Sequence, residues 1–133
     1  MSSAAEAGIE ASADLRRVTR RWTNALLEGD EAFVHRLVSE HPVALFVGTD
    51  DAEWAEGHDD IVRALARRMR GLRPTRLLEA RVGAYRRAGV GWSYARVVLA
   101  IPGVGEVGFR ETSVFLLEHG EWRLVQHHAS VGA

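Results

Sequence analysis

The chain has 133 residues, of which 47% are hydrophobic and 26% charged, a composition typical of a folded domain. Its formal net charge of −1 gives no reason to expect a nucleic-acid partner, and the absence of cysteine excludes disulfides and thiolate metal ligands. All 17 basic residues are arginine, which favours a GC-rich bacterial source. No signal peptide or membrane span is predicted, so we expect a cytoplasmic protein without a membrane partner.

The first third of the chain predicts two helices. We expect residues 1–12 to form a flexible N-terminal arm and residues 13–133 a single domain. Ser12 or Asp14 can cap the first helix, Gly29 ends it, and Asp30 can cap the second. The predicted buried faces of the two helices consist of Leu15, Val18, Trp22, Ala25 and Leu26, and of Phe33, Val34, Leu37 and Val38.

Two short extended segments and a third helix follow. Residues 43–47 are almost wholly apolar and predict a buried strand, and residues 52–56 predict a short extended segment that carries Trp54. Gly57 and His58 open the third helix, with Asp59 in its first turn, where a carboxylate suits the helix dipole. Its predicted buried stripe consists of Ile61, Leu65 and Met69.

From residue 75 the hydrophobic period changes to two. Four strands are predicted near 75–86, 90–101, 106–117 and 121–131, with no helix between them, so these strands must pair antiparallel. Helices followed by a strand meander indicate an α+β fold, with N-terminal helices packed on a strongly curved mixed or antiparallel sheet.

The lengths of the turns predict which residues share a face of the sheet. A three-residue loop at residues 118–120 would place Glu111 opposite His127, and a loop around residues 102–105 would place Arg96 opposite Glu111. The same register puts eight further residues on that inner face: Ala80, Ala84, Trp92, Tyr94, Val98, Phe109, Ser113 and Phe115.

The opposite face is predicted to be too apolar for open solvent. It would carry Val97, Leu99, Val114, Leu116, Trp122 and Leu124, together with Arg110, Gln126 and His128. A second copy of the chain would cover this face, so we expect a homodimer through the outer face of the sheet. A one-residue slip in register would exchange the two faces.

The closing strands resemble those of SnoaL-like domains, in the nuclear transport factor 2-like superfamily. The resemblance lies in residues 109–115, the turn at His119 and Gly120, and residues 121–130, whose pattern matches the family at Trp122, His128 and Ser130. Residues 56–59, which open a helix, match a second recurrent feature. The association domain of calcium/calmodulin-dependent kinase is similar from about residue 22 to residue 130.

The resemblance implies a cone-shaped α+β fold, a pocket between helices and sheet, and a dimer. It also implies that Ile61 and Met69 line the pocket and that Arg96 and Ser113 lie on its inner strands. Independently of the resemblance, Trp22 and Trp54 could stack on a ligand or pack in the core. The kinase domain carries two further pocket arginines where this chain has Ser113 and Ala129. The paired aspartates and tyrosine of steroid isomerases are not visible in this sequence.

His127, Glu111 and Arg96 are the predicted catalytic residues. A carboxylate beside an imidazole orients it and favours its protonated form, and an arginine could hold an anionic group or an enolate. The alternative is a buried ion-pair network without a catalytic role. The predicted ligand-binding residues are Trp22, Trp54, Ile61, Met69, Tyr94, Phe109, Ser113 and Phe115.

Three further patterns have simpler structural interpretations. Asp50, Asp51, His58 and Asp59 could bind a cation, but a loop and a helix start explain them. His127 and His128 are neighbours on a strand and must point to opposite faces, so we predict no metal site and no cofactor. The glycines of residues 103–108 fit a hairpin, because a strand rather than a helix follows them.

Three functions are therefore open. The first is a small-molecule-binding pocket protein of the SnoaL-like kind. The second is an isomerase, cyclase or hydrolase acting on a small, partly apolar, carbonyl-containing or polycyclic substrate. The third is an oligomerisation or accessory module with a vestigial pocket.

Overall fold

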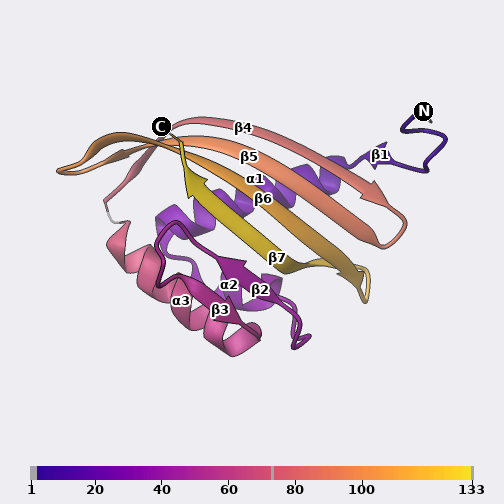
Figure 1. Cartoon of the computed structure of the whole chain (residues 1–133), viewed down its shortest axis with the longest axis horizontal. Helices are drawn as coiled ribbons and strands as arrows, with labels where there is room; N and C mark the ends of the chain where they lie inside the picture. The colour runs from indigo at the N-terminus through magenta and orange to yellow at the C-terminus, as the bar shows by residue number, and fades with distance from the viewer. Residues whose placement is uncertain (1–2, 73, 133) are drawn as a thin grey trace.

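Four long antiparallel strands form most of a curved sheet in the computed structural model, which describes residues 3–72 and 74–132. They arch over the helices in Figure 1. The long strands are β4 (Arg76–Arg87), β5 (Val90–Ile101), β6 (Gly105–Glu118) and β7 (Glu121–Val131). The sheet is mixed and has the order β1-β4-β5-β6-β7-β2-β3, which confirms the predicted α+β class.

Three short strands extend the sheet at its edges. Strand β2 (Leu45–Val47) lies parallel to β7, and β3 (Trp54–Glu56) pairs antiparallel with β2. Strand β1 (Glu10–Ala11) pairs with β4, although the sequence analysis assigned both of its residues to a flexible arm.

All three helices lie on the concave side of the long strands (Figure 1). They are α1 (Ala13–Glu28), α2 (Glu31–Leu37) and α3 (His58–Gly71). The hydroxyl of Ser12 accepts a hydrogen bond from the Leu15 N–H at 3.1 Å, and Asp30 caps α2 through the Phe33 N–H at 3.1 Å. Gly29 ends α1 with a φ of 73°, a conformation that costs glycine little. These caps confirm the predicted helix boundaries.

The core between helices and sheet has two parts. The larger joins all three helices to β2, β6 and β7, and its fully buried side chains include Leu15, Val34, Phe46, Ile61, Leu65 and Phe115. The smaller lies under the far ends of β4, β5 and β6 and consists of Val82, Ala95, Val97, Leu99 and Phe109, with Leu27 and Leu72 packed against it. The end of α1 and the residue after α3 therefore cover the smaller part.

The hairpin between β5 and β6 differs from its prediction by one residue. Ile101 pairs with Gly105, so the loop has three residues, and Arg96 pairs with Arg110 instead of Glu111. Because side chains alternate along a strand, this slip reverses every side chain of β5. Val97 and Leu99 are buried against the helices, whereas Trp92, Tyr94, Arg96 and Val98 lie on the outer face, contrary to the prediction.

The hairpin between β6 and β7 differs from its prediction by two one-residue shifts in register. Together they move the pairing by two residues, so the side chains beyond the second shift return to the predicted face. The loop has two residues, His119 and Gly120, both with positive φ (52° and 79°), and Glu118 pairs with Glu121. A bulge at Val125 then shifts the register by one more residue. His127 therefore stays on the predicted inner face, opposite Ser113.

The first part of β7 was predicted on the wrong face. Phe115 pairs with Leu124, and both Trp122 and Leu124 are buried toward the helices. Ala84 is buried on the same face, as predicted.

Candidate functional site

A chain of three polar side chains crosses the buried face of β6 and β7. The Ser113 hydroxyl lies 2.7 Å from Nδ1 of His127, and Nε2 of His127 lies 3.2 Å from Oε1 of Glu111. His127 is only 2% exposed, so unpaired ring nitrogens would be costly. Ser113 can donate to Nδ1 of a neutral imidazole, and the Glu111 carboxylate lies beside Nε2.

Two aromatic rings hold the imidazole in place. The Trp22 ring, from α1, lies 5.1 Å from the His127 ring between centroids, and Phe46, from β2, stacks on it at 5.7 Å with an interplanar angle of 4°. Parallel pairing of β2 with β7 places Phe46 directly beside His127. The imidazole is thereby fixed both by its hydrogen bonds and by packing.

Two buried polar atoms near Ser113, His127 and Glu111 have no hydrogen-bond partner among the described residues. One is Nε1 of Trp22, and the other is the hydroxyl of Ser93, which pairs across the sheet with Ser113. Such orphaned groups are uncommon inside proteins. Both atoms lie in the layer between α1 and the sheet, so this layer holds polar groups that its hydrogen bonds do not satisfy.

Glu111, the third of the polar side chains after Ser113 and His127, lines a small cavity of about 30 Å³. Its carboxylate contacts His127 on one side, and the residue also lines the cavity. The other lining residues come from α1, α3 and the sheet: Thr23, Leu26, Leu27, Arg68, Leu72, Val97, Leu99 and Phe109. The cavity has room for about one water molecule.

Arg68 supplies the second charge at the cavity. Nη1 of Arg68 donates to Oε2 of Glu53 at 2.7 Å, and its guanidinium lies 5.8 Å from the centre of the Phe109 ring. The sequence analysis did not identify Arg68. A signal was present, because Arg68 lies seven residues after Ile61 and therefore falls on the predicted buried stripe of the third helix.

The predicted catalytic residues are only partly brought together. Glu111 and His127 are in contact, but Arg96 lies on the outer face of the sheet because of the slipped hairpin. The role that the resemblance implied for Arg96 in an inner pocket does not fit this position.

The predicted ligand-binding residues also divide between inside and outside. Trp22, Ile61, Met69, Phe109, Ser113 and Phe115 are buried on the inner side. Trp54 and Tyr94 are 61% and 42% exposed, so neither reaches the interior. Phe109 lines the cavity itself, whereas Trp22, Ile61, Met69 and Phe115 pack in the larger part of the core and do not line it.

The remaining polar patterns follow their structural interpretations. Asp50 accepts from the Ala52 N–H at 2.9 Å in a turn, and His127 and His128 lie on opposite faces of β7. No group of three or more histidine and acidic residues that could hold a metal ion occurs within residues 3–72 and 74–132.

His58, at the start of α3, makes two hydrogen bonds. Its Nδ1 lies 2.9 Å from Oδ1 of Asp59, and its Nε2 lies 2.8 Å from the carbonyl oxygen of His35. Burial lowers the pKa of His58, but the hydrogen bonds to Asp59 and the carbonyl of His35 outweigh burial and raise the pKa above 6.5. The same contact with His58 lowers the pKa of Asp59.

Comparison with known proteins agrees with this architecture. The model of the SnoaL-like domain family matches residues 15–133, so the chain belongs to this family. No curated protein matches the chain. Among the described residues, no helix is long and apolar enough to cross a membrane.

Several solved structures share this fold at low sequence identity, and the first of these is a nuclear transport factor 2-like protein. One is a protein of unknown function from Pseudomonas putida, with a TM-score of 0.73, 16% identity, and coverage of 98% of this chain and 88% of that one. Another, from Xanthomonas campestris, is provisionally named a calcium/calmodulin-dependent protein kinase II association domain (TM-score 0.67, 17% identity, coverage 90% and 86%).

A third, from Shewanella frigidimarina, is provisionally named a ketosteroid isomerase (TM-score 0.68, 15% identity, coverage 86% and 92%). At these identities the comparisons establish the fold alone.

Proposed function

We propose that this chain binds a small, mostly apolar molecule in the cavity between α1, α3 and the sheet. The observation that carries the proposal is the position of Glu111, a carboxylate that lines an apolar cavity while His127 holds its other side. An oriented polar group in an apolar enclosure is the usual pattern of a small-molecule site. A ligand would place an O–H or N–H group on Glu111 and its apolar body against Leu99 and Phe109.

A ligand larger than water requires the cavity to widen. Typical small-molecule pockets have volumes of roughly 300 Å³ or more. Leu27 and Leu72 are only partly buried and cover the smaller core, so their displacement would enlarge the cavity without disturbing the main core. The site would therefore open at the end of α3.

Phenol is a suitable probe, because it combines one hydroxyl donor with an apolar ring. We expect phenol to shift the amide resonances of Leu72, Leu99 and Phe109 in ¹H–¹⁵N spectra. Leu72→Ala, which enlarges the cavity, should strengthen binding, and Glu111→Gln, which keeps the shape and removes the charge, should weaken it. If phenol shifts these resonances in neither the wild type nor Leu72→Ala, the site is vestigial and the proposal is wrong.

The contact between Glu111 and His127 favours a second candidate, a general acid–base enzyme for carbonyl compounds. Glu111 would take a proton from the carbon beside the carbonyl, leaving an enolate, and would return it. Arg68, in place of the predicted Arg96, would stabilise the enolate oxygen. Hydrogen–deuterium exchange of cyclohexanone in D₂O tests this function: Glu111→Gln should abolish catalysed exchange, and an equal rate without protein would exclude it.

For the outer face of the sheet, we propose a homodimer. Trp92, Val114 and Leu116 form a half-buried band there, with the exposed Tyr85 and Val90 beside it. Such a band favours an interface. Sedimentation of the wild type should give a dimer and Val114→Glu a monomer with unchanged circular dichroism. A wild-type monomer at all concentrations would contradict the proposal.

A further inference from the structure

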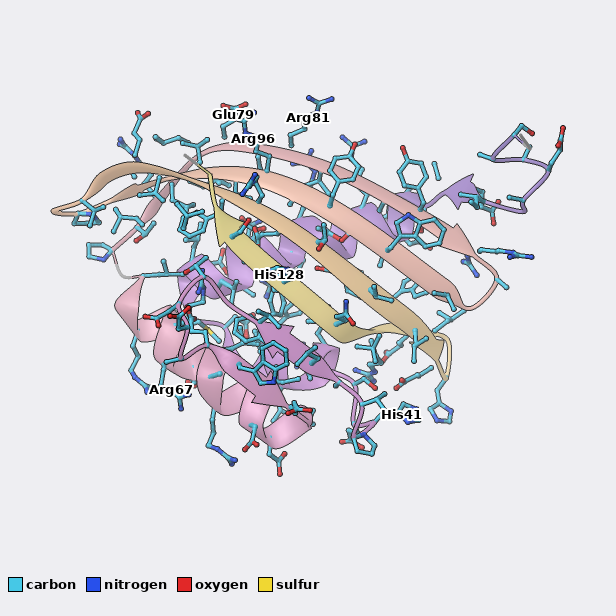
Figure 2. All side chains as sticks on the ribbon, viewed as in Figure 1. His41, Arg67, Glu79, Arg81, Arg96 and His128 are labelled. Atoms are coloured by element: carbon cyan, nitrogen blue, oxygen red, sulfur yellow. The ribbon has the colours of Figure 1, made fainter. Side chains whose placement is uncertain are left out.

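Three arginines lie side by side on the outer face of the sheet. Arg81 of β4 pairs with Arg96 of β5, which pairs with Arg110 of β6, and all three side chains are exposed. Figure 2 shows Arg81 and Arg96 on the side of the sheet turned away from the helices. Neighbouring strands are about 4.8 Å apart, so three like charges occupy directly opposed positions, an arrangement that destabilises a sheet.

Glu79 lies on the same face as this row, two residues before Arg81, but forms no ion pair with it among the described residues. Arg81, Arg96 and Arg110 make no ion pair in the part of the chain that the structure describes. Five other arginines do pair with carboxylates: Arg17, Arg21, Arg63, Arg68 and Arg123. The chain has a net charge of −1, so the row is a local concentration of positive charge on a nearly neutral protein.

A groove of about 350 Å³ adjoins two of these arginines. The side chains that line it can all donate hydrogen bonds, and they are Tyr94, Arg96, Arg110, Thr112, His128 and Ser130. Ala95 and Glu111 also border the groove, but their side chains point to the buried face of the sheet. The groove therefore presents donors without a carboxylate.

We propose that this groove binds a small molecule that carries a diphosphate group. A guanidinium can donate two parallel hydrogen bonds to one phosphoryl group. Arg96 and Arg110 lie on neighbouring strands, so each could bind one of the two phosphoryl groups of a diphosphate. The hydroxyls of Thr112 and Ser130 are placed to donate to the remaining oxygens.

Tyr94 provides a surface for the organic part of such a ligand. A Cβ atom added at Gly83 would lie 2.4 Å from the Tyr94 ring, so the ring lies across the glycine of the neighbouring strand. The ring is 42% exposed and borders the groove. This site lies on the opposite face of the sheet from the cavity of Glu111 and is independent of it.

Titration calorimetry with inorganic pyrophosphate at low ionic strength tests the proposal. We expect one saturable site per chain, with an affinity that falls as salt is added. Arg96→Gln and Arg110→Gln should each weaken binding about tenfold or more, as loss of a charge-assisted hydrogen bond does. Arg96→Lys keeps the charge but not the paired donors, so it should weaken binding less than Arg96→Gln does.

Arg67→Gln is the matched control, because Arg67 is an exposed arginine of α3 on the far side of the molecule (Figure 2). It should bind pyrophosphate like the wild type. The proposal is overturned if the wild type shows no saturable binding, if Arg67→Gln weakens binding as much as Arg96→Gln, or if orthophosphate binds as tightly as pyrophosphate. Circular dichroism and sedimentation of each variant show that fold and assembly are retained.

Discussion

The two faces of the long strands carry polar residues under opposite conditions. On β6, Glu111 and Ser113 point toward the helices and contact His127, whereas Arg110 points outward beside Arg96 and forms no ion pair with a carboxylate among the described residues. An unpaired polar group destabilises the fold when it is buried, but it costs little free energy when water can bind it. The exceptions on each face are therefore the informative features: orphaned atoms inside, and adjacent like charges outside.

The largest expected difference between the faces is between two neighbouring histidines. His127→Ala removes a ring packed by Trp22 and leaves Ser113 and Glu111 unpaired, so we expect the free energy of unfolding to fall by about 3 kcal/mol. His128→Ala, on the exposed face, should change it by less than about 0.5 kcal/mol. Urea denaturation measures both. Similar losses would mean that the buried chain contributes no special stability.

Two glycines offer the same comparison for packing. A Cβ atom at Gly91 would lie 2.5 Å from the buried Leu15, whereas one at Gly83 would meet the exposed Tyr94 ring, which can move into solvent. We expect Gly91→Ala to cost about 1–3 kcal/mol, as overpacking of a core does. Gly83→Ala should cost less than about 1 kcal/mol. A thermal unfolding series that reversed this order would place the Gly91 side of β5 outside the core.

On the outer face, removal of a charge should stabilise the protein. Arg96→Gln relieves repulsion from both Arg81 and Arg110, so we expect a gain of about 0.2–1 kcal/mol. The gain should shrink as salt screens the charges. Urea denaturation at low and high ionic strength measures the gain, with Arg67→Gln as the control that shows none. A loss of stability in Arg96→Gln would mean that the row is neutralised within the protein.

The smallest effect is expected at His58, which is paired but lies outside the sheet. The folded state raises the pKa of His58 above 6.5, so His58 stabilises the fold fully below that unfolded value. This contribution is lost as pH rises through the folded pKa. The stability difference between the wild type and His58→Asn should therefore be larger near about pH 6 than near about pH 8. A difference that grows with pH would show that burial dominates the pKa.

Local signals in the sequence predicted the helices well. Ser12, Gly29 and Asp30 act within one turn of the positions that they specify, so caps could be assigned without knowledge of the rest of the fold. The stripe of Ile61, Leu65 and Met69 is buried as predicted, because helical spacing of apolar residues is also a local signal.

Strand register was harder to predict, because it depends on single residues in loops. One residue too many in the predicted β5–β6 loop moved Arg96 and Tyr94 to the wrong face. His127 kept its predicted face because the turn and the bulge each shifted β7 by one residue. The residues around Val125 do carry a local signal, because the alternation of Trp122 and Leu124 breaks at the consecutive apolar residues Leu124 and Val125.

The bulge at Val125 has a consequence for how the length of β7 can vary. It divides the strand into two segments of opposite phase, so Trp122 and Leu124 face the same side as His127 and Ala129. Deletion of Val125 would leave a strand that alternates without interruption, with Trp122, Leu124, His127 and Ala129 still on one face. Bulges also increase local twist, so the same deletion would flatten β7 beside the end of α2. At its present length β7 needs the extra residue at Val125, because pairing Val125 into the ladder would turn either Trp122 and Leu124 or His127 and Ala129 toward solvent, whereas deletion of Val125 itself would keep both pairs buried.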